Sequence, residues 1–485
     1  MLAIVLGLLT VLGLLLNGSW DLWAQSLLFL AVLGAAALWL CGRLLAGFVP
    51  LPPGRLLAWT AGLAAWGGVS AYAGPLPAYA APAWHVWLAA LGAILAVSVM
   101  PEGQRRLLDR GIRAAAWFLA AVAVYQRFGL GMERPCASLL NPNAFAGAIL
   151  LLLPLAVDQK DWLLAGGLLL CLSWTRSVGA WLGLAAALLL LRRRSALWTA
   201  VGAGTGCVCL AVIFAKLDAP DALNRWHWWL AAARMGWARP WFGFGPGTYA
   251  YVLPAYAATG RPLGTLFAHQ HFLETAAEMG LPYLLAWLTG LFFLLRRGPT
   301  AKRVGAVAVL VQSLWDYALS IPAILWLFCC QAASSIQESG HGANIPARWR
   351  LPGCVLVLAV TWGAGTAVWQ RWQAERLRVE AEGILRSAGP SPSALDFLER
   401  SARLCGHPET ARLSGQIEAA LARQPGGKGR ILAAAADLER AVAQNPYRAS
   451  TWTMLETVYR QMGRGDLARA ARRRGAASCP GLRGP

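Results

Sequence analysis

About thirteen apolar runs follow one another along the first 370 residues, and they constrain this chain more than any other feature of its sequence. Backbone N–H and C=O groups find no water inside a bilayer, so a segment that crosses it satisfies its own hydrogen bonds as a helix. The sequence therefore predicts an all-α, polytopic transmembrane bundle of about 12–13 spans. The expected spans are residues 2–16, 22–41, 56–73, 84–100, 114–130, 144–158, 161–175, 178–191, 196–215, 281–295, 304–319, 321–335 and 352–370.

The overall composition excludes an ordinary soluble globule, because 57% of the residues are hydrophobic and only 14% are charged. Basic residues are in excess, with 43 Lys and Arg against 23 Asp and Glu. Such an excess can indicate nucleic-acid binding, but most of these residues sit in short clusters between apolar runs. This pattern indicates membrane topology, with anionic ligands as a secondary use.

The basic residues mark alternate gaps between the spans. Positive residues are enriched on the cytoplasmic side, so the N-terminus is predicted to lie inside, with the first apolar run kept as a span rather than a cleaved signal peptide. The gaps on the other side carry little beyond Arg134 and Arg176. The basic gaps contain Arg43, Arg55, Arg105, Arg106, Arg110, Arg113, Lys160, Arg192, Arg193, Arg194, Arg296, Arg297, Lys302, Arg303, Arg348 and Arg350.

One long interval, residues 216–280, is too polar and too broken by Gly and Pro to lie in a bilayer. The charge pattern places it outside, and we expect it to be an outward-facing catalytic loop. It concentrates groups that could bind or react: Arg225, His227, Arg234, Arg239, Arg261, His269, His271, Glu274 and Glu278.

The two histidines near the end of this loop do not predict a metal site. His269 and His271 are two residues apart, so they would diverge on a helix, and no third ligand follows at a suitable spacing. A helix is expected from about His271 to Met279, with Glu274 and Glu278 on one face.

A glycine-rich piece, residues 242–247, precedes these histidines. Its backbone could approach an anion closely, but its spacing differs from known phosphate-binding loops and Pro246 lacks an N–H donor. The alternative is a re-entrant turn between an interfacial helix and the next one.

Further polar residues lie at the outer ends of distant spans. Ionisable groups are costly at membrane depth, so several of them facing one compartment predict a shared polar cavity. A guanidinium group can donate two parallel hydrogen bonds to the oxygens of one phosphate, so a phosphate ligand needs no metal there. The alternative for each arginine is contact with lipid headgroups. These residues are Arg134, Asn141, Asn143, Arg176 and Asp316.

The chain changes character after residue 370, where apolar runs give way to Arg, Glu, Ala and Gln at helical spacing. We expect residues 371–485 to form a small helical domain on the outer face of the membrane. Near its end, Leu438, Ala441, Trp452, Leu455, Tyr459, Gly463 and Ala468 follow the spacing of a tetratricopeptide-type repeat. The alternative is an amphipathic spacer. Cys405 and Cys479 would share an oxidising compartment and could pair.

Several short motifs occur in order between about residues 125 and 335. They are Asn141-Pro142-Asn143-Ala144-Phe145-Ala146, Thr175-Arg176-Ser177-Val178-Gly179-Ala180-Trp181, Arg225 with Trp228, the stretch 240–247, His269 with Glu278-Met279-Gly280, and Ser313-Leu314-Trp315-Asp316-Tyr317. Their order and their placement around a long outer loop resemble the O-antigen ligase and polymerase superfamily of bacterial envelope glycosyltransferases.

The resemblance implies a membrane-embedded glycosyltransferase over residues 1–370 that uses no metal and no cofactor. It would transfer a glycan from an undecaprenyl diphosphate carrier to an acceptor hydroxyl at the outer face of the bacterial inner membrane. His269 matches the expected general base, and Arg225 matches an arginine at the donor diphosphate. The further substrate-binding candidates are Arg176, Arg261, Arg239, Arg134, Asn143, Asp316, His271 and Glu278.

Three positions depart from the family pattern. Val178 stands where an arginine is usual, and Arg176 lies two residues earlier. Gln270 replaces an asparagine and Gln312 replaces a histidine, which preserves hydrogen-bonding capacity.

The acceptor stays open at this point, since a lipid A-core, a carrier-linked glycan and a protein hydroxyl use similar sites. Ligation, polymerisation and protein O-glycosylation are therefore alternatives within one superfamily. A hypothesis of another class is a non-catalytic envelope transporter or assembly protein that recruits a protein partner through the helical tail. No internal duplication of the kind common in transporters is evident in the sequence.

Overall fold

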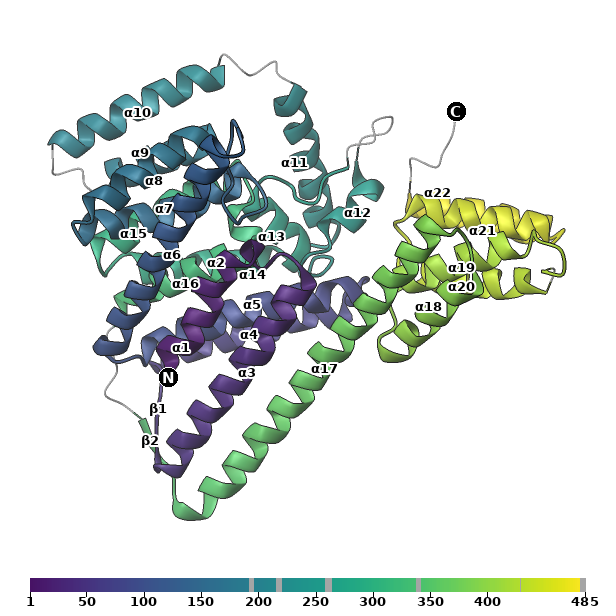
Figure 1. The fold of residues 1–485 in the computed structure, drawn as a ribbon, viewed down its shortest axis with the longest axis horizontal. Coiled ribbons are helices and arrows are strands. Elements are labelled where there is room, and N and C mark those ends of the chain that lie inside the picture. The colour runs from purple at the N-terminus through teal and green to yellow at the C-terminus, as the bar shows by residue number, and fades with distance from the viewer. Residues whose placement is uncertain (192–195, 215–219, 258–263, 337–341, 428, 480–485) are drawn as a thin grey trace.

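The computed structural model describes residues 1–485 except 192–195, 215–219, 258–263, 337–341, 428 and 480–485. The described chain is almost entirely helical, which confirms the all-α prediction. Figure 1 shows a bundle of helices from which one long helix, α17, leads to a smaller group of helices that carries the C-terminus.

The bundle contains a helix for each predicted span, and most bounds agree within a few residues. Helices α5 and α6 are the exceptions, because they begin 7 and 12 residues before the predicted starts at residues 84 and 114. The first span is α1 (Leu2–Gly7), η1 (Leu8–Leu12) and α2 (Gly13–Leu15), followed by the short η2 (Asn17–Ser19). The others are α3 (Leu22–Leu45), α4 (Gly54–Ala73), α5 (Pro77–Ser98), α6 (Glu102–Phe128), α7 (Pro142–Asp158), α8 (Trp162–Thr175), α9 (Val178–Leu191), α10 (Ala196–Phe214), α14 (Leu281–Leu295), α15 (Thr300–Gln312), α16 (Pro322–Ala332) with η4 (Ala333–Ser335), and the first part of α17 (Ala347–Ser387).

Three of these helices, α3, α5 and α17, are long and apolar enough to cross a membrane by length and composition, and several shorter apolar helices accompany them in the described part of the chain. Large hydrophobic side chains such as Leu38, Leu163 and Trp362 are exposed on the outside of the bundle. Exposed apolar surface on this scale is what a lipid-facing protein presents. The chain is therefore a membrane protein.

The predicted span over residues 304–319 is wrong in its second half. Helix α15 ends at Gln312, where the N–H groups of Leu314 and Trp315 bond carbonyls three residues back and tighten the last turn. Residues 313–317 form a turn, and η3 (Ala318–Ser320) leads into α16, which begins with Pro322 at a position that needs no N–H donor. The sequence did not predict this break because Leu314 and Trp315 are apolar, so the apolar run continues across the turn.

Helix α16 lies at the centre of the bundle and is buried along its whole length. Its Trp326 Nε1 donates to the carbonyl of Val86, 2.9 Å away on α5. On the other side of the bundle, Gly183 of α9 allows a close approach to α15, because a Cβ there would lie 2.2 Å from the carbonyl oxygen of Ala308. These contacts fix the end of α15 and the turn that follows it.

A two-stranded antiparallel ladder joins two loops at one end of the bundle. Strand β1 (Phe48–Pro50) pairs with β2 (Gly342–Asn344), with Phe48 opposite Asn344. The ladder holds the start of α17 beside the end of α3, and the two helices then pack along each other (Figure 1).

Helix α17 continues without a break through residue 371, where the sequence predicts the start of the tail. The tail helices are α18 (Pro392–Leu404), α19 (Pro408–Leu421), α20 (Arg430–Gln444), α21 (Ala449–Gln461) and α22 (Gly465–Ser478). Leu438, Trp452 and Leu455 are buried in their core, as the spacing predicts. The assignment to the tetratricopeptide family stays a prediction. The thiols of Cys405 and Cys479 are both free, so the suggested pairing is not formed.

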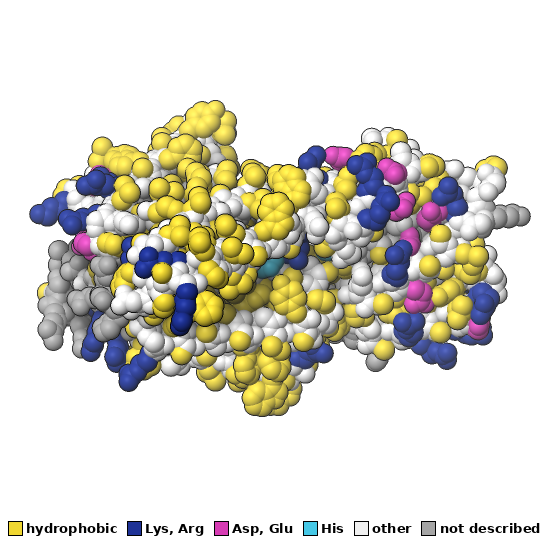
Figure 2. Space-filling model, turned by 90° about the horizontal axis from the view of Figure 1, so that it is seen from below, with side chains coloured by type: hydrophobic (Ala, Val, Ile, Leu, Met, Phe, Trp, Pro, Cys, Tyr) yellow, Lys and Arg dark blue, Asp and Glu magenta, His cyan; other side chains and the backbone are white. Residues whose placement is uncertain are grey.

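The tail docks on the bundle and on the loop. Tyr79, at the start of α5, donates a hydrogen bond of 2.9 Å to Glu409 of α19 and stacks on Tyr251 at 3.8 Å between ring centroids. Arg448 also pairs with Glu409, and Tyr447 contacts Phe244 edge-on. Figure 2 shows the mixed charges of the tail beside the mostly hydrophobic surface of the bundle.

Candidate active site

The described part of the long loop folds into three helices and a glycine-rich turn. The helices are α11 (Pro220–Ala238), α12 (Tyr249–Tyr256) and α13 (His271–Met279), the last with the predicted bounds. Gly243 has a φ of 63°, and a Cβ there would lie 2.3 Å from the backbone of Glu278. Only glycine fits that approach, which brings the turn against the end of α13.

The N–H groups of this turn are already bonded. The carboxylate of Glu278 accepts from Gly247 N at 2.8 Å and from Tyr249 N at 2.9 Å. The backbone carbonyl of Glu278 accepts from Gly245 N at 2.7 Å. These N–H groups donate to Glu278 and are not directed at an open anion site. The turn therefore fits the alternative of a re-entrant turn better than that of a phosphate-binding loop. Glu278, predicted as a substrate-binding residue, is buried, with both carboxylate oxygens bonded to the turn.

We expect Glu278→Gln to lower the thermal stability of the protein. A glutamine presents one NH₂ group where the carboxylate accepted, so one buried backbone N–H loses its acceptor, at a cost of about 1–3 kcal/mol. Thermal unfolding of the purified protein measures the loss. Glu133→Gln is the control, because Glu133 is exposed and its ion pair contributes little. Equal melting temperatures for the two variants would contradict the role given to Glu278.

His269 lies just before α13 in a strained backbone conformation with a φ of 54°. The next residue, Gln270, caps the helix by accepting from Leu273 N at 2.6 Å. Glu274 accepts from Ala268 N at 2.7 Å, and Trp229 Nε1 donates to the His269 carbonyl at 3.3 Å. These hydrogen bonds hold His269 in its strained backbone conformation. Such strain is common at functional sites, where the orientation of a side chain matters.

The imidazole of His269 lies between an aromatic face and a carboxylate. Trp228 of α11 stacks on it, with ring centroids 5.0 Å apart, and Tyr317 contacts it edge-on at 4.8 Å. Its Nδ1 is 3.8 Å from Oδ1 of Asp316, and 20% of its side chain is accessible. The ring is thus oriented by packing while part of it faces open space.

Asp316 stands in the turn that ends α15, and only 5% of it is exposed. Its Oδ1 accepts from Tyr317 N at 2.9 Å. Its electrostatic partners include Arg225 and Arg134, and Asn143 lies beside it. Arg225 is held in place by a bond of 3.0 Å from Nη1 to the carbonyl of Trp315, the residue before Asp316.

Asn143 and Arg134 come from the other side of the site. Asn141 caps α7 by accepting from the N–H groups of Asn143 and Ala144, both at 2.9 Å, and Pro142 occupies the first helical position. Arg134 Nη2 donates to Asn143 Oδ1 at 3.3 Å, and its Nε donates to the Thr175 carbonyl at 3.0 Å. Gln312, one of the departures from the family pattern, donates to the Asn143 carbonyl at 3.0 Å.

The structure thus brings five predicted site residues into one network: His269, Asp316, Arg225, Asn143 and Arg134. The sequence interpretation missed the roles of Trp228 and Tyr317, which form the walls around the imidazole. Both residues belong to the motifs quoted above, so the motifs could have identified them as site residues. Tyr317 also accepts a hydrogen bond from Asn141 Nδ2, which links the His269 side of the site to the cap of α7.

The remaining candidates lie elsewhere or at the edge. Arg176 follows Thr175 in a left-handed conformation and forms an exposed ion pair of 3.2 Å with Glu133. Arg239 lies over the ring of Phe244, 5.3 Å from its centroid, on the side facing the tail. His271 is buried, with Nδ1 3.3 Å from Ser320 Oγ and its ring stacked on Trp87. Arg261 lies outside the described residues.

This arrangement suits proton transfer beside an anionic group. An imidazole held against a carboxylate is a common general base. Arg225 and Arg134 carry positive charge near this carboxylate, that of Asp316. Within the described residues, neither arginine forms an ion pair closer than 4.0 Å, although both act on Asp316 at longer range. Apolar helices surround the site, which strengthens such electrostatic contacts.

Comparison with known proteins points to one family. Residues 163–288 match the family model described as O-antigen ligase, a range from α8 to α14 that includes Arg225 and His269. No curated protein matches the chain. The match covers about a quarter of the chain and falls within the helical membrane bundle and its long loop. This range is similar to the O-antigen ligase superfamily, which supports the resemblance carried by the motifs.

Proposed function

We propose that this protein transfers a glycan from a polyprenyl diphosphate carrier, such as undecaprenyl diphosphate, to an acceptor hydroxyl at the periplasmic face of the inner membrane. Ligation of O-antigen or a related surface polysaccharide is the reaction that the family match favours. The observation that carries the proposal is the position of His269, 3.8 Å from buried Asp316, which also has Arg225 among its electrostatic partners.

His269 is proposed as the general base. Its imidazole takes the proton of the acceptor hydroxyl while that oxygen attacks the anomeric carbon of the donor glycan. The bond between this carbon and the diphosphate oxygen breaks, and the diphosphate leaves with the electron pair. Asp316 stabilises the positive charge that forms on the imidazole, and Trp228 holds the ring in plane.

Arg225 and Arg134 are proposed to bind the donor diphosphate and to stabilise the charge that grows on it. Asn143 ties Arg134 to Asp316, so the anion site and the base are built from one network. Arg176 is a further candidate, since its exposed pair with Glu133 costs little to exchange for a phosphate contact. Arg239 and Arg261 are the other two arginines that the sequence analysis proposes for substrate binding.

The orientation rests on the distribution of basic residues. The gaps rich in Lys and Arg are assigned to the cytoplasm, so the loop 216–280 and the tail lie in the periplasm. A carrier-linked glycan on that face would meet His269 from outside. Cysteine accessibility to a membrane-impermeant thiol reagent in whole cells tests this topology, with single cysteines placed at Arg239 and at Arg297.

The proposal is tested with purified protein in vesicles that contain a polyprenyl-diphosphate-linked glycan and an acceptor glycolipid. Formation of the glycosylated acceptor, detected by mass spectrometry, supports it. Unchanged donor and acceptor in the presence of folded protein would reject it. Mass analysis of the glycan attachment in cells with and without the protein identifies the acceptor.

Removal of divalent metal ions is expected to leave this transfer within about twofold of its rate, because the proposal assigns the charge of the leaving diphosphate to arginines. The measurement compares transfer before and after dialysis against EDTA. A control reaction contains EDTA with excess Mg²⁺. A loss of transfer that Mg²⁺ restores would show that a cation, rather than Arg225 and Arg134, carries this task.

A further inference from the structure

A large cavity lies on the other side of α5 from the candidate active site. Its volume is about 840 Å³, and its walls come from the first span, α3, α4, α5, β1 and α17. Trp87 of α5 faces the active-site side, where it stacks on His271. Nearby His85 lines the cavity instead, so α5 separates the two sites.

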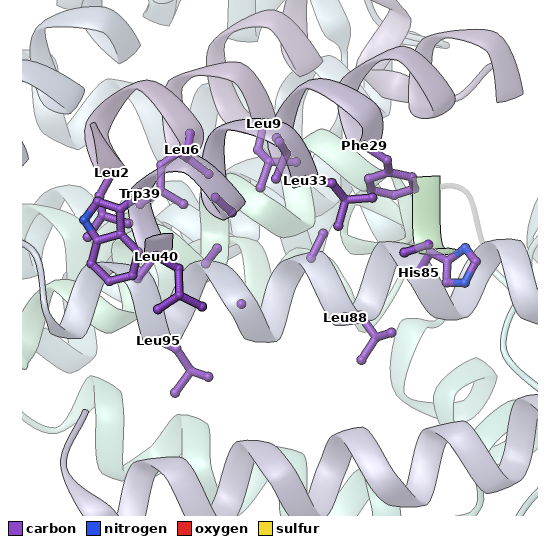
Figure 3. Close-up of a pocket in the computed structure, with 18 of the residues that line it drawn as sticks. Leu2, Leu6, Leu9, Phe29, Leu33, Trp39, Leu40, His85, Leu88 and Leu95 are labelled. Atoms are coloured by element: carbon purple, nitrogen blue, oxygen red, sulfur yellow. The ribbon is translucent and has the colours of Figure 1, made fainter. Parts of the chain in front are cut away.

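The cavity is long and almost wholly apolar. Along α5 it is lined from His85 to Val99, the residue that follows the helix, and these fourteen residue steps correspond to about 21 Å. Among the side chains that line it, only Trp39, Tyr72 and His85 carry a polar atom. Figure 3 shows Phe29 and His85 at one end, with Leu2 and Trp39 at the other. This shape suits an extended hydrocarbon chain rather than a compact polar ligand.

The end of the cavity near the tail carries a positive charge. A small adjoining pocket shares Phe29, His85 and Val368 with the cavity and adds Gln25 and Arg371. Arg371 Nη1 is 3.5 Å from His85 Nδ1, and Tyr72 OH is 3.5 Å from His85 Nε2. Within the described residues, Arg371 has no carboxylate within 4.0 Å, whereas Arg376 and Arg378 on the same helix are paired with glutamates.

We propose that this cavity is a binding site for an anionic glycerophospholipid of the surrounding membrane. One acyl chain fills the apolar cavity, and the phosphate lies at Arg371 beside His85. The selectivity comes from the net negative charge that the headgroup places at Arg371, because an acyl chain already in the bilayer gains little from transfer into another apolar site. The bound acyl chain makes packing contacts with the cavity walls that are missing when the cavity is empty.

The position of Arg371 gives the bound lipid a consequence for the fold. Arg371 stands on α17 where this helix passes from the bundle to the tail, and its charge also acts on His407 of α19. A phosphate at this point therefore holds the junction between α3, α5 and α17 beside the docked tail. The site is independent of the proposed transfer reaction, and its occupancy is measured without any glycan substrate.

The test uses the full chain, purified in a neutral detergent and stripped of lipid. Phosphatidylglycerol is expected to raise the melting temperature by about 2–4 °C more than phosphatidylcholine with the same acyl chains, because only a net anionic lipid complements Arg371. Arg371→Gln is expected to remove this difference. Arg386→Gln is the matched control, since Arg386 is exposed on the same helix and pairs with Glu382.

A second variant tests the cavity itself. Gly92 lines the cavity, and a Cβ at this position meets no atom within 4 Å, so Gly92→Leu fills the space without displacing the backbone. Native mass spectrometry is expected to show one bound phosphatidylglycerol fewer for this variant. Gly166→Leu on α8 is the control, because its Cβ also meets no atom within 4 Å and it lies outside the cavity.

Three results would overturn the proposal. The first is an equal effect of the two phospholipids on the parent protein, and the second is full phosphatidylglycerol retention by Gly92→Leu. The third is displacement of the retained phospholipid by an equimolar amount of polyprenyl phosphate, which would assign the cavity to a different lipid.

Discussion

Replacing His269 with alanine is expected to lower the rate of glycan transfer by about 10²–10⁴-fold, the range that general-base catalysis contributes. The imidazole Nδ1 lies 3.8 Å from Oδ1 of buried Asp316, and 20% of the side chain is exposed, so the ring can accept a proton from a substrate. The measurement is the initial rate of transfer from the carrier-linked donor at saturating acceptor. Thermal unfolding of the same sample checks that the variant is folded.

Two further variants separate chemistry from packing. His227→Ala removes another half-buried histidine of the same loop, on α11, and is expected to keep transfer within about twofold because this histidine lies outside the network. Asp316→Asn keeps the shape but removes the charge that stabilises the imidazolium, so an intermediate loss is expected. Full activity of folded His269→Ala would exclude this histidine as the base.

The membrane part of the fold was predictable because a span leaves a direct signal, a run of apolar residues of fixed minimum length. The predicted start of α3 and the whole of α14 coincide with the structure. The error over residues 304–319 has a physical cause. Trp315 and Leu314 are apolar, so hydropathy continues across a turn that only the hydrogen bonds of Gln312 and the following residues reveal.

The candidate site was predictable only in part. His269 and Arg225 stand in recognisable motifs, but burial of Glu278 and its bonds to the glycine-rich turn depend on tertiary packing. A loop carboxylate in sequence looks the same whether it faces a ligand or caps a turn. For the same reason His271 resembles a ligand-binding residue, whereas the structure packs it against Trp87.

Replacing Arg225 with alanine is expected to lower kcat/KM for the donor by about 10²–10³-fold, as loss of one group that stabilises a developing anion does. Arg225 is the only residue of the described network that combines a positive charge with a direct bond to the turn carrying Asp316. Arg225→Lys keeps the charge but loses the planar pair of donors, so partial activity is expected. The measurement is transfer at varied donor concentration.

A second readout separates diphosphate binding from mere support of the turn. If Arg225 binds the leaving group, the variants lose inhibition by added polyprenyl diphosphate in proportion to their loss of transfer. Arg234→Ala is the matched control, since Arg234 also lies on α11 and also donates to a backbone carbonyl, that of Tyr256 at 3.3 Å. Unchanged inhibition in Arg225→Ala together with lost transfer would show that Arg225 only positions Asp316, and the diphosphate contact would then belong to Arg134 and its neighbours.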